Sequence, residues 1–435
     1  MKILLTGARI IDPIQNIDAD MDILLENGKI AKIGADILKS AKSKDSGKIK
    51  IIELAGMIIV PGLIDMHTHL REPGLEYKET IASGAAAAVA GGFTSIACMP
   101  NTNPINDNRS ITEFIKRKAS EAALANVYPI GAISKGSTGS QLTEFWDMKE
   151  AGIIALSDDG KPVMDAALMR RAMEYAYSLG LPVISHCEDT NLSGGGLMNE
   201  GYYSTILGLR GIPGIAEEAM VARDILIAEF TNTCVHIAHV STAGSVRLIR
   251  EAKKRGLKVT AETAPHYFTL TEEALQSYNT SFKVNPPLRS EQDVAVIKEG
   301  LSDGTLDVIA CDHAPHGRTD KEVEFEYAAN GISGLETSLS LSLNLIQNKT
   351  LNWPELIAKM SANPARILNL PKGTLEVGAD ADITVIDPQL KWTVDVQTFR
   401  SRGKNSPFNG RQMQGKAVLT IVGGEIKYAL PSLKL

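Results

Sequence analysis

The chain has 435 residues, of which 44% are hydrophobic, and this size and composition suit a globular enzyme with a large core. The net charge of −6 comes from interspersed acidic and basic residues, so the sequence offers no basic stripe for nucleic acid. The first residues turn polar too soon for a signal peptide, and no apolar run approaches the length of a membrane span. We therefore expect a cytoplasmic protein with neither nucleic acid nor membrane as partner.

Both ends of the chain have β character. The predicted strands are residues 2–11, 22–33, 50–53, 379–387 and 416–428. The Asn27-Gly28 step indicates a hairpin turn, and the polar stretch 38–50 predicts an exposed loop. We infer that residues 1–60 and 371–435 form one small β domain, with the central part of the chain inserted between them.

The centre of the chain alternates short β-rich runs with longer helical patterns, which is typical of parallel βα units. The β-rich runs are residues 58–66, 94–99, 127–133, 153–158, 182–187, 235–240, 258–263 and 307–312. Helical patterns between them include residues 77–90, 109–123, 166–179, 216–229 and 294–301. Eight such units predict an α/β fold, a TIM (β/α)8 barrel over residues 61–370.

Histidines and aspartates collect where the predicted barrel strands end. They are His67 and His69, Asp158 and Asp159, His186, His239, and Asp312 with His313. The carboxyl ends of barrel strands meet at one rim, and His67 and His69 point to the same side of their strand because they are two residues apart. Nitrogen and oxygen ligands without thiolate suit Zn²⁺, with Mn²⁺, Co²⁺ or Fe²⁺ as substitutes.

Several stretches resemble the amidohydrolase superfamily and, within it, the bacterial type I dihydroorotases. They are PGLIDMHTHLREPG at 61–74, MPNTNP at 99–104, NPPLR at 285–289, DHAPH at 312–316 and GADAD at 378–382. The resemblance covers nearly the whole chain. It implies one or two zinc ions, with two favoured: His67, His69 and Asp312 would hold one, His186 and His239 the second, and Asp159 would bridge them.

The resemblance also implies a reaction, the reversible ring closure of N-carbamoyl-L-aspartate to L-dihydroorotate in de novo pyrimidine biosynthesis. In the ring-opening direction a hydroxide between the metals would attack the ring amide, with Asp312 as general acid/base. The substrate contacts that it implies are His69, Arg71, Asn101, Asn285, His316, Asn330 and Gly331. Asn330-Gly331 depart from the family, which usually has an aromatic or small residue before the glycine.

Arg71 lies two residues past His69, where a planar bidentate cation would bind the carboxylate of such a substrate. The alternative is a surface arginine paired with Glu72 or Glu76. Asn285 would otherwise cap the turn into the prolines that follow it. Residues 316–334 are polar and flanked by glycines, and they predict a mobile loop beside the site.

Many superfamily relatives bridge their metals with a carbamylated lysine. Lys161 lies between Gly160 and Pro162 in a predicted turn, so Asp159 is the better bridge, and Asp158 is expected to be structural or to support a ligand. His236 cannot share the side of the strand that His239 occupies, and we expect it to be packed or to support a ligand. His266 stays without a role.

Two other functions stay open. A hydantoinase or allantoinase would share the barrel and the histidines, but its substrate lacks the ring carboxylate and leaves Arg71 without a role. A non-catalytic relative that serves as a structural partner would lose ligands, whereas every expected ligand position is filled here. We further expect a homo-oligomer, with association with another pyrimidine-pathway enzyme as an option.

Overall fold

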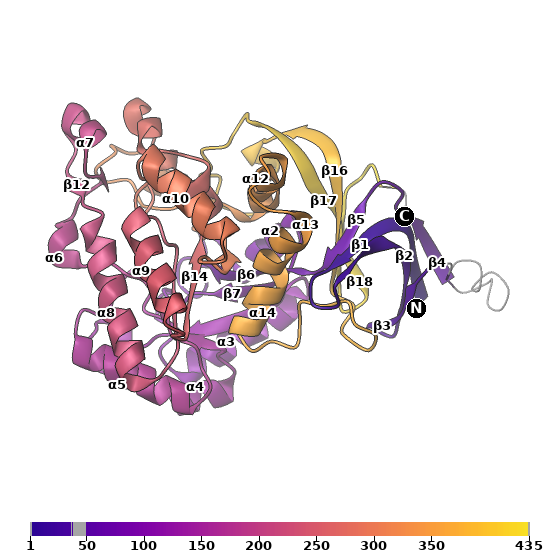
Figure 1. The fold of residues 1–435 in the computed structure, drawn as a ribbon, viewed down its shortest axis with the longest axis horizontal. Helices are drawn as coiled ribbons and strands as arrows, with labels where there is room; N and C mark the ends of the chain where they lie inside the picture. Colours follow the sequence, from indigo (N-terminus) through magenta and orange to yellow (C-terminus); the bar gives the residue numbers. More distant parts are fainter. Residues whose placement is uncertain (1, 36, 38–48, 434–435) are drawn as a thin grey trace.

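The computed structural model describes residues 2–35, 37 and 49–433, and it shows two parts (Figure 1). A barrel wrapped by helices lies at the left of the view, and a sheet that holds both chain ends lies at the right. Most of the predicted exposed loop at 38–50 falls outside the described residues. No helix in the described ranges is long and apolar enough to cross a bilayer.

The sheet at the right combines strands from both ends of the chain, as the sequence predicts. Its strands are β1 (Lys2–Asp12), β2 (Ile17–Glu26), β3 (Lys29–Gly34), β4 (Ile49–Glu53), β5 (Ile58–Pro61), β16 (Ile383–Thr393), β17 (Gln412–Val422) and β18 (Glu425–Ala429). The order is β18-β17-β16-β5-β1-β2-β3, and β4 also pairs with β1. The turn at Asn27-Gly28 is confirmed, but the strand before it begins at Ile17 instead of at residue 22.

Eight parallel strands form the barrel. They are β6 (Leu63–Thr68), β7 (Phe93–Cys98), β8 (Asn126–Gly131), β9 (Ala155–Leu156), β10 (Ile184–Ser185), β13 (Val235–Ile237), β14 (Val259–Thr263) and β15 (Val308–Ile309). They pair as two runs of four, and the parallel bridges Leu156–Val183 and Thr68–His313 join the runs into a closed ring. The predicted TIM barrel is confirmed.

Helices surround the barrel on its outside (Figure 1). The α-helices of the described residues are α2 (Ile81–Gly91), α3 (Arg109–Ala122), α4 (Phe145–Ala151), α5 (Ala166–Ser178), α6 (Thr190–Ser193), α7 (Tyr202–Leu207), α8 (Ile215–Thr231), α9 (Ala243–Lys254), α10 (Glu291–Ser302), α11 (Arg318–Lys321), α12 (Leu335–Gln347), α13 (Trp353–Ile357) and α14 (Asn363–Ile367). The segment of the chain between α6 and α8 forms a short two-stranded sheet, β11 (Met198–Asn199) with β12 (Gly211–Ile212). The five predicted helices are all present.

Caps explain where two helices begin. The predicted helix 77–90 starts at Ile81 because the Thr80 side chain accepts a hydrogen bond from the Ser83 amide. The predicted helix 294–301 starts earlier, at Glu291, because Ser290 and Asp293 cap each other reciprocally.

The predicted first barrel strand, residues 58–66, is wrong as one element, because the chain breaks at Gly62. β5 pairs with β1 and β16 in the outer sheet, whereas β6 pairs with β7 in the barrel. A Cβ atom at Gly62 would lie 2.1 Å from the Thr94 hydroxyl oxygen, so only glycine permits this close crossing. The apolar run continues on both sides of Gly62, which hides the break in the sequence.

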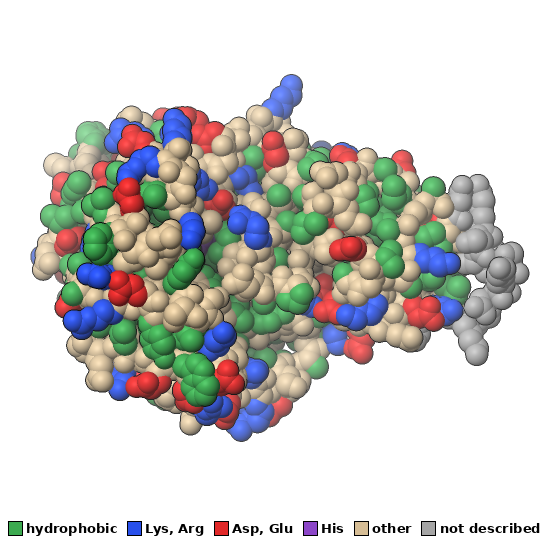
Figure 2. Space-filling view, turned by 60° about the horizontal axis from the view of Figure 1, so that its bottom comes forward, with side chains coloured by type: hydrophobic (Ala, Val, Ile, Leu, Met, Phe, Trp, Pro, Cys, Tyr) green, Lys and Arg blue, Asp and Glu red, His purple; other side chains and the backbone are tan. Residues whose placement is uncertain are grey.

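An apolar cluster fills the barrel interior and leaves the polar side chains at one end. It contains Met66, Ala97, Met99, Ile130, Ala155, Ile184, Ala238, Val308, Ala310 and Leu368. Since the strands are parallel, the residues that follow them all emerge at the carboxyl rim. On the face drawn in Figure 2, cationic and acidic side chains are interspersed.

Candidate metal centre

The six predicted metal ligands meet at the carboxyl rim of the barrel. His67 lies in β6 and His69 just beyond it; Asp159, His186, His239 and Asp312 follow β9, β10, β13 and β15. All six are buried. The structure therefore brings together side chains that are up to 245 positions apart, from His67 to Asp312.

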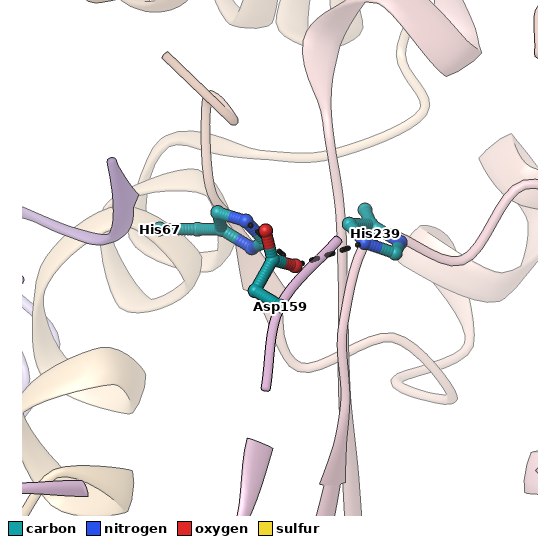
Figure 3. Close-up of side chains that lie close together, drawn as sticks. All are labelled: His67, Asp159 and His239. Carbon is teal, nitrogen blue, oxygen red and sulfur yellow. Dashed lines mark ion pairs between the residues drawn. The ribbon is translucent and has the colours of Figure 1, made fainter. Parts of the chain in front are cut away.

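The Asp159 carboxylate lies between His67 and His239 (Figure 3). Its Oδ1 is 3.4 Å from both His67 Nε2 and His239 Nε2. The same oxygen is 3.5 Å from His186 Nδ1, and Oδ2 is 3.5 Å from His69 Nε2. One carboxylate thus faces all four imidazoles, which is the arrangement that a bridging ligand needs.

Asp312 completes the cluster on the side of β6. Its Oδ1 is 3.1 Å from His69 Nε2 and 3.5 Å from His67 Nε2. Two sets of three residues each bring their donor atoms within 4.8 Å of one another. One set is His67, Asp159 and His239, and the other is His67, His69 and Asp312. His186 joins through its Nδ1, which is 2.7 Å from His239 Nε2.

The chemistry of these donors fits a metal ion. His67 Nε2 and Asp159 Oδ1 are buried polar atoms without a hydrogen-bond partner among the described residues, and such atoms are rare unless a ligand satisfies them. Imidazole nitrogens and carboxylate oxygens, with no thiolate, are the donors that Zn²⁺ takes at catalytic sites. The residues present therefore fit a divalent cation of the zinc type.

Both aspartates are held in the ionised form. Burial raises the pKa of Asp159, but the charge of His67 and the close approach of His186 Nδ1 and His239 Nε2 at 3.5 and 3.4 Å outweigh it, so this pKa lies well below its ordinary value. Burial also raises the pKa of Asp312, and the charge of His67 with the hydrogen bond from His69 again prevails and lowers it.

Two glutamates near the cluster are absent from the sequence prediction. Glu262 in β14 places Oε1 2.5 Å from His67 Nδ1. Glu188 places Oε2 3.1 Å from His186 Nε2 and accepts a 2.8 Å hydrogen bond from the Asn285 side chain. The sequence did contain a signal for Glu262, because it is a charged residue inside an apolar strand. Such a buried charge requires a partner, and this would have indicated a contact with the site.

Arg71 is buried beside the cluster. Its Nε donates to the Pro315 carbonyl at 3.2 Å, and its Nη2 is 3.3 Å from His316 Nε2. Burial lowers the pKa of Arg71 to about 10, against the charges of Asp312 and Asp159, so the side chain stays cationic at neutral pH. The alternative of a surface arginine is wrong.

The glutamates proposed for that surface pair have other partners. Glu72 accepts from the Ile81 amide at 2.9 Å, and Glu76 accepts from the Gly74 amide at 2.8 Å. Among the described residues no ion pair between Arg71 and a carboxylate occurs within 4.0 Å. The guanidinium is thus a buried charge available to an anionic ligand.

The remaining predicted substrate residues surround the cluster. Asn101 Oδ1 is 2.8 Å from His69 Nδ1, and Asn285 bonds Glu188 instead of capping the turn that follows it. His316 Nε2 donates to the Asn330 carbonyl at 2.8 Å, and burial lowers the pKa of His316 to about 2. The Gly331 amide donates to the Lys283 carbonyl at 2.9 Å.

The neighbours of the bridge lie as expected from the sequence. Lys161 is exposed, and its amide bonds the Asp158 carbonyl. Asp158 accepts from the Ile133 amide at 2.8 Å and from the Ser134 amide and hydroxyl, so it holds the loop after β8. His266 is buried with its Nε2 unpartnered among the described residues, and burial lowers its pKa to about 4.

The closed parallel barrel with buried histidines and aspartates at its carboxyl rim is the architecture of an amidohydrolase. A dihydro-orotase-like family model matches residues 56–245, and an amidohydrolase family model matches residues 218–428. The chain belongs to the dihydroorotase family and is a metal-dependent cyclic amide hydrolase.

Individual relatives support this assignment. The chain is 62% identical to a dihydroorotase of Syntrophus aciditrophicus over 98% of this chain and 99% of that protein. It is 55% identical to a dihydroorotase of Geotalea daltonii, again over 98% and 99%. Among solved structures, an L-hydantoinase (dihydropyrimidinase) from Arthrobacter aurescens superposes with a TM-score of 0.86 at 26% identity, covering 100% of this chain and 97% of that chain.

Proposed function

We propose that the protein catalyses the reversible ring closure of N-carbamoyl-L-aspartate to L-dihydroorotate. The observation that carries this proposal is the buried Arg71 guanidinium beside the histidine–aspartate cluster, bonded to the Pro315 carbonyl and to no carboxylate of the described chain. Dihydroorotate carries a carboxylate on its ring, and a planar bidentate cation recognises that group. The name shared by relatives at 54 to 62% identity agrees with this substrate.

Two zinc ions are the proposed cofactor. His67, His69 and Asp312 would hold one ion, His186 and His239 the other, and Asp159 would bridge them, as its four imidazole neighbours favour. Bound zinc supplies Lewis acidity toward a carbonyl oxygen and lowers the pKa of water.

Asp312 is the proposed general acid/base. Its carboxylate is ionised, lies at the edge of the cluster and is able to accept the proton of the attacking water in the ring-opening direction. The same oxygen then donates that proton to the leaving ring nitrogen. In ring closure Asp312 reverses both transfers.

The other chain residues bind and orient the substrate. Arg71 would hold the ring carboxylate, and the Asn101 and Asn285 amides would contact the ring, because an amide both donates and accepts. His316 and the Asn330-Gly331 backbone would close the opposite side, and His69 would contact substrate from the metal edge. Carboxylate binding by Arg71 separates this reaction from that of a hydantoinase or allantoinase.

A substrate panel tests the proposal. Metal-free protein, reloaded with zinc, is assayed for ring opening of dihydroorotate, hydantoin and allantoin. We expect zinc-dependent turnover of dihydroorotate with kcat/KM far above the values for the other two rings. Preferred turnover of hydantoin or allantoin, or no turnover of any ring after zinc loading, contradicts the proposal.

The Arg71→Ala variant sharpens this test. Loss of a charge-assisted bidentate pair costs about 2 to 4 kcal/mol, so kcat/KM for dihydroorotate should fall by about 30- to 1000-fold while the zinc content is unchanged. Arg318→Ala is the matched control, because the Arg318 side chain is 83% exposed and pairs only with Glu322 in the described structure. Near-normal kcat/KM in Arg71→Ala rules out the carboxylate-binding role.

A homo-oligomer, association with another enzyme of the pathway and a cytoplasmic location stay predictions of the sequence.

A further inference from the structure

A buried chain of hydrogen bonds lies beneath His67. Glu262 in β14 places Oε1 2.5 Å from His67 Nδ1 and Oε2 3.3 Å from His236 Nε2. His236 Nδ1 in turn is 2.8 Å from the Thr260 hydroxyl. The side chains of His67, His236 and Glu262 are at most 1% exposed, so their polar atoms must satisfy one another.

The roles of the atoms in this chain follow from their chemistry. A carboxylate only accepts hydrogen bonds, so His67 Nδ1 and His236 Nε2 must each carry a hydrogen and donate it to Glu262. His236 Nδ1 lies 2.8 Å from the Thr260 hydroxyl, which is able both to donate and to accept. The contact with Glu262 therefore places a hydrogen on Nδ1 of His67.

The consequence appears on the other side of the His67 ring. With Nδ1 bound to Glu262, Nε2 is the nitrogen of His67 that is left for a metal ion, and it lies 3.4 Å from Asp159 Oδ1 and 3.5 Å from Asp312 Oδ1. That nitrogen is the buried atom without a hydrogen-bond partner in the described residues. His67 also belongs to both groups of candidate ligands, so its tautomer affects both.

We infer that Glu262, backed by His236, is a positioning residue that fixes the tautomer and ring orientation of His67 and strengthens it as a metal ligand. This inference rests on the proposed metal centre. A carboxylate that accepts the second N–H of a ligating histidine raises the basicity of the ligand, and its loss weakens metal binding by about 10- to 100-fold.

In the described structure, His69 and His186 have different partners at their second nitrogen. His69 Nδ1 meets the neutral amide oxygen of Asn101 at 2.8 Å. His186 meets Glu188, whose side chain is 16% exposed and is shared with Asn285. Among these partners of the histidines, Glu262 is the fully buried carboxylate. Its Oε1 accepts from the candidate ligand His67 and its Oε2 accepts from His236.

Zinc affinity and the hydrogen bond at His67 Nδ1 test this inference together. Metal-free wild type, Glu262→Gln and Asp12→Asn are titrated with zinc against a fluorescent chelator of known affinity. The Nδ1 proton of His67 is followed in the zinc-loaded proteins by NMR of labelled histidine. Wild type should show a strongly downfield Nδ1 proton, whereas Glu262→Gln should shift it upfield, because an amide is a weaker acceptor than a carboxylate, and should raise the zinc Kd by about 10- to 100-fold.

Asp12→Asn is the matched control. Asp12 is fully buried in the outer sheet and accepts from the Ile14 and Leu375 amides, far in the chain from any candidate ligand. Its substitution should lower Tm and leave the zinc Kd within about 2-fold of wild type. This control separates a general loss of a buried carboxylate from a loss of support for His67.

Three results overturn the inference. Wild-type protein that binds no zinc removes the metal centre and the proposed function with it. Wild-type protein that binds zinc, with Glu262→Gln unchanged in zinc Kd and in the Nδ1 proton shift, overturns the inference alone. If Glu262→Gln does not fold, Glu262→Asp replaces it, because the shorter side chain keeps the carboxylate but withdraws it from His67 Nδ1; a zinc Kd and proton shift equal to wild type then overturn the inference.

Discussion

Three residues of the site hold a backbone conformation that favours glycine. The φ angles of Arg71, His239 and Asp312 are 62°, 33° and 47°. For residues with a side chain this region costs about 1 to 3 kcal/mol, and it persists where the surroundings fix it. Each of the three follows a barrel strand, and the turn in the backbone directs its side chain into the rim. The strain is therefore part of what positions the site.

Asp312→Asn separates proton transfer from folding. The amide has nearly the same shape and tolerates a positive φ, so the fold should persist. Turnover should fall by about 100- to 10,000-fold because the amide cannot accept the proton, and zinc content should drop in part. Steady-state rates are measured beside metal analysis of the same sample. Substantial activity in metal-loaded Asp312→Asn excludes the general acid/base role.

The bridging carboxylate is tested by a pair of substitutions. Asp159→Ala should lose the second metal and activity, because Asp159 faces all four imidazoles. Lys161→Ala should keep both, with no dependence on bicarbonate, because Lys161 is exposed. Metal analysis and activity with and without bicarbonate check this. A fully loaded Asp159→Ala protein, with a Lys161→Ala protein rescued by bicarbonate, would instead identify a carbamylated lysine.

At the scale of elements, the sequence predicts what local periodicity encodes. The barrel strands and their helices follow from alternating patterns, and the polar residues after each strand locate the rim. The break at Gly62 cannot be predicted from the sequence, because both flanking strands are apolar and only the close approach of Thr94 requires the glycine. The roles of Glu262 and Glu188 cannot be predicted either, because tertiary contacts bring them to His67 and His186. The positive φ angles also depend on tertiary contacts and are not predicted from the sequence.

The segment that the sequence predicts as a mobile loop, residues 316–334, has internal anchors. Lys321 is buried, and its Nζ donates to the Ala329 carbonyl at 2.7 Å and the Gly331 carbonyl at 3.3 Å. Lys283 Nζ donates to the Phe325 and Glu326 carbonyls at 2.7 and 2.8 Å. Two lysines thus fold the segment back beside His316, whose Nε2 bonds the Asn330 carbonyl.

Lys321→Met should loosen this segment. The aliphatic part of the side chain is kept, but the carbonyls of Ala329 and Gly331 lose the Nζ donor, which costs about 1 to 3 kcal/mol locally. We expect faster proteolysis between residues 318 and 331 and a raised KM for dihydroorotate, because His316 loses its ordered partner Asn330. Arg318→Met, in the same segment but exposed, serves as control. Equal proteolysis in the two variants contradicts the anchoring role.

At the scale of the whole molecule, threonines join the outer sheet to the barrel. The Thr420 hydroxyl on β17 donates to the Val89 carbonyl of α2 at 2.7 Å. The Thr384 hydroxyl on β16 donates to the Gly92 carbonyl at 2.5 Å and accepts from the Leu63 amide at 3.2 Å. Leu63 begins β6, the strand that carries His67, so the sheet from both chain ends supports the first strand of the site.

Thr384→Val tests this connection. Valine fills nearly the same volume, so the change leaves the buried Leu63 amide and Gly92 carbonyl without their partner, at a cost of about 1 to 3 kcal/mol each. Tm should fall by several degrees, and zinc affinity should fall with it because β6 is displaced at its start. Thr398→Val is the control, since the Thr398 hydroxyl is exposed and bonds the Asp395 carbonyl within its own turn. A Tm for Thr384→Val as high as that of Thr398→Val would show that the sheet contributes nothing to the barrel through this residue.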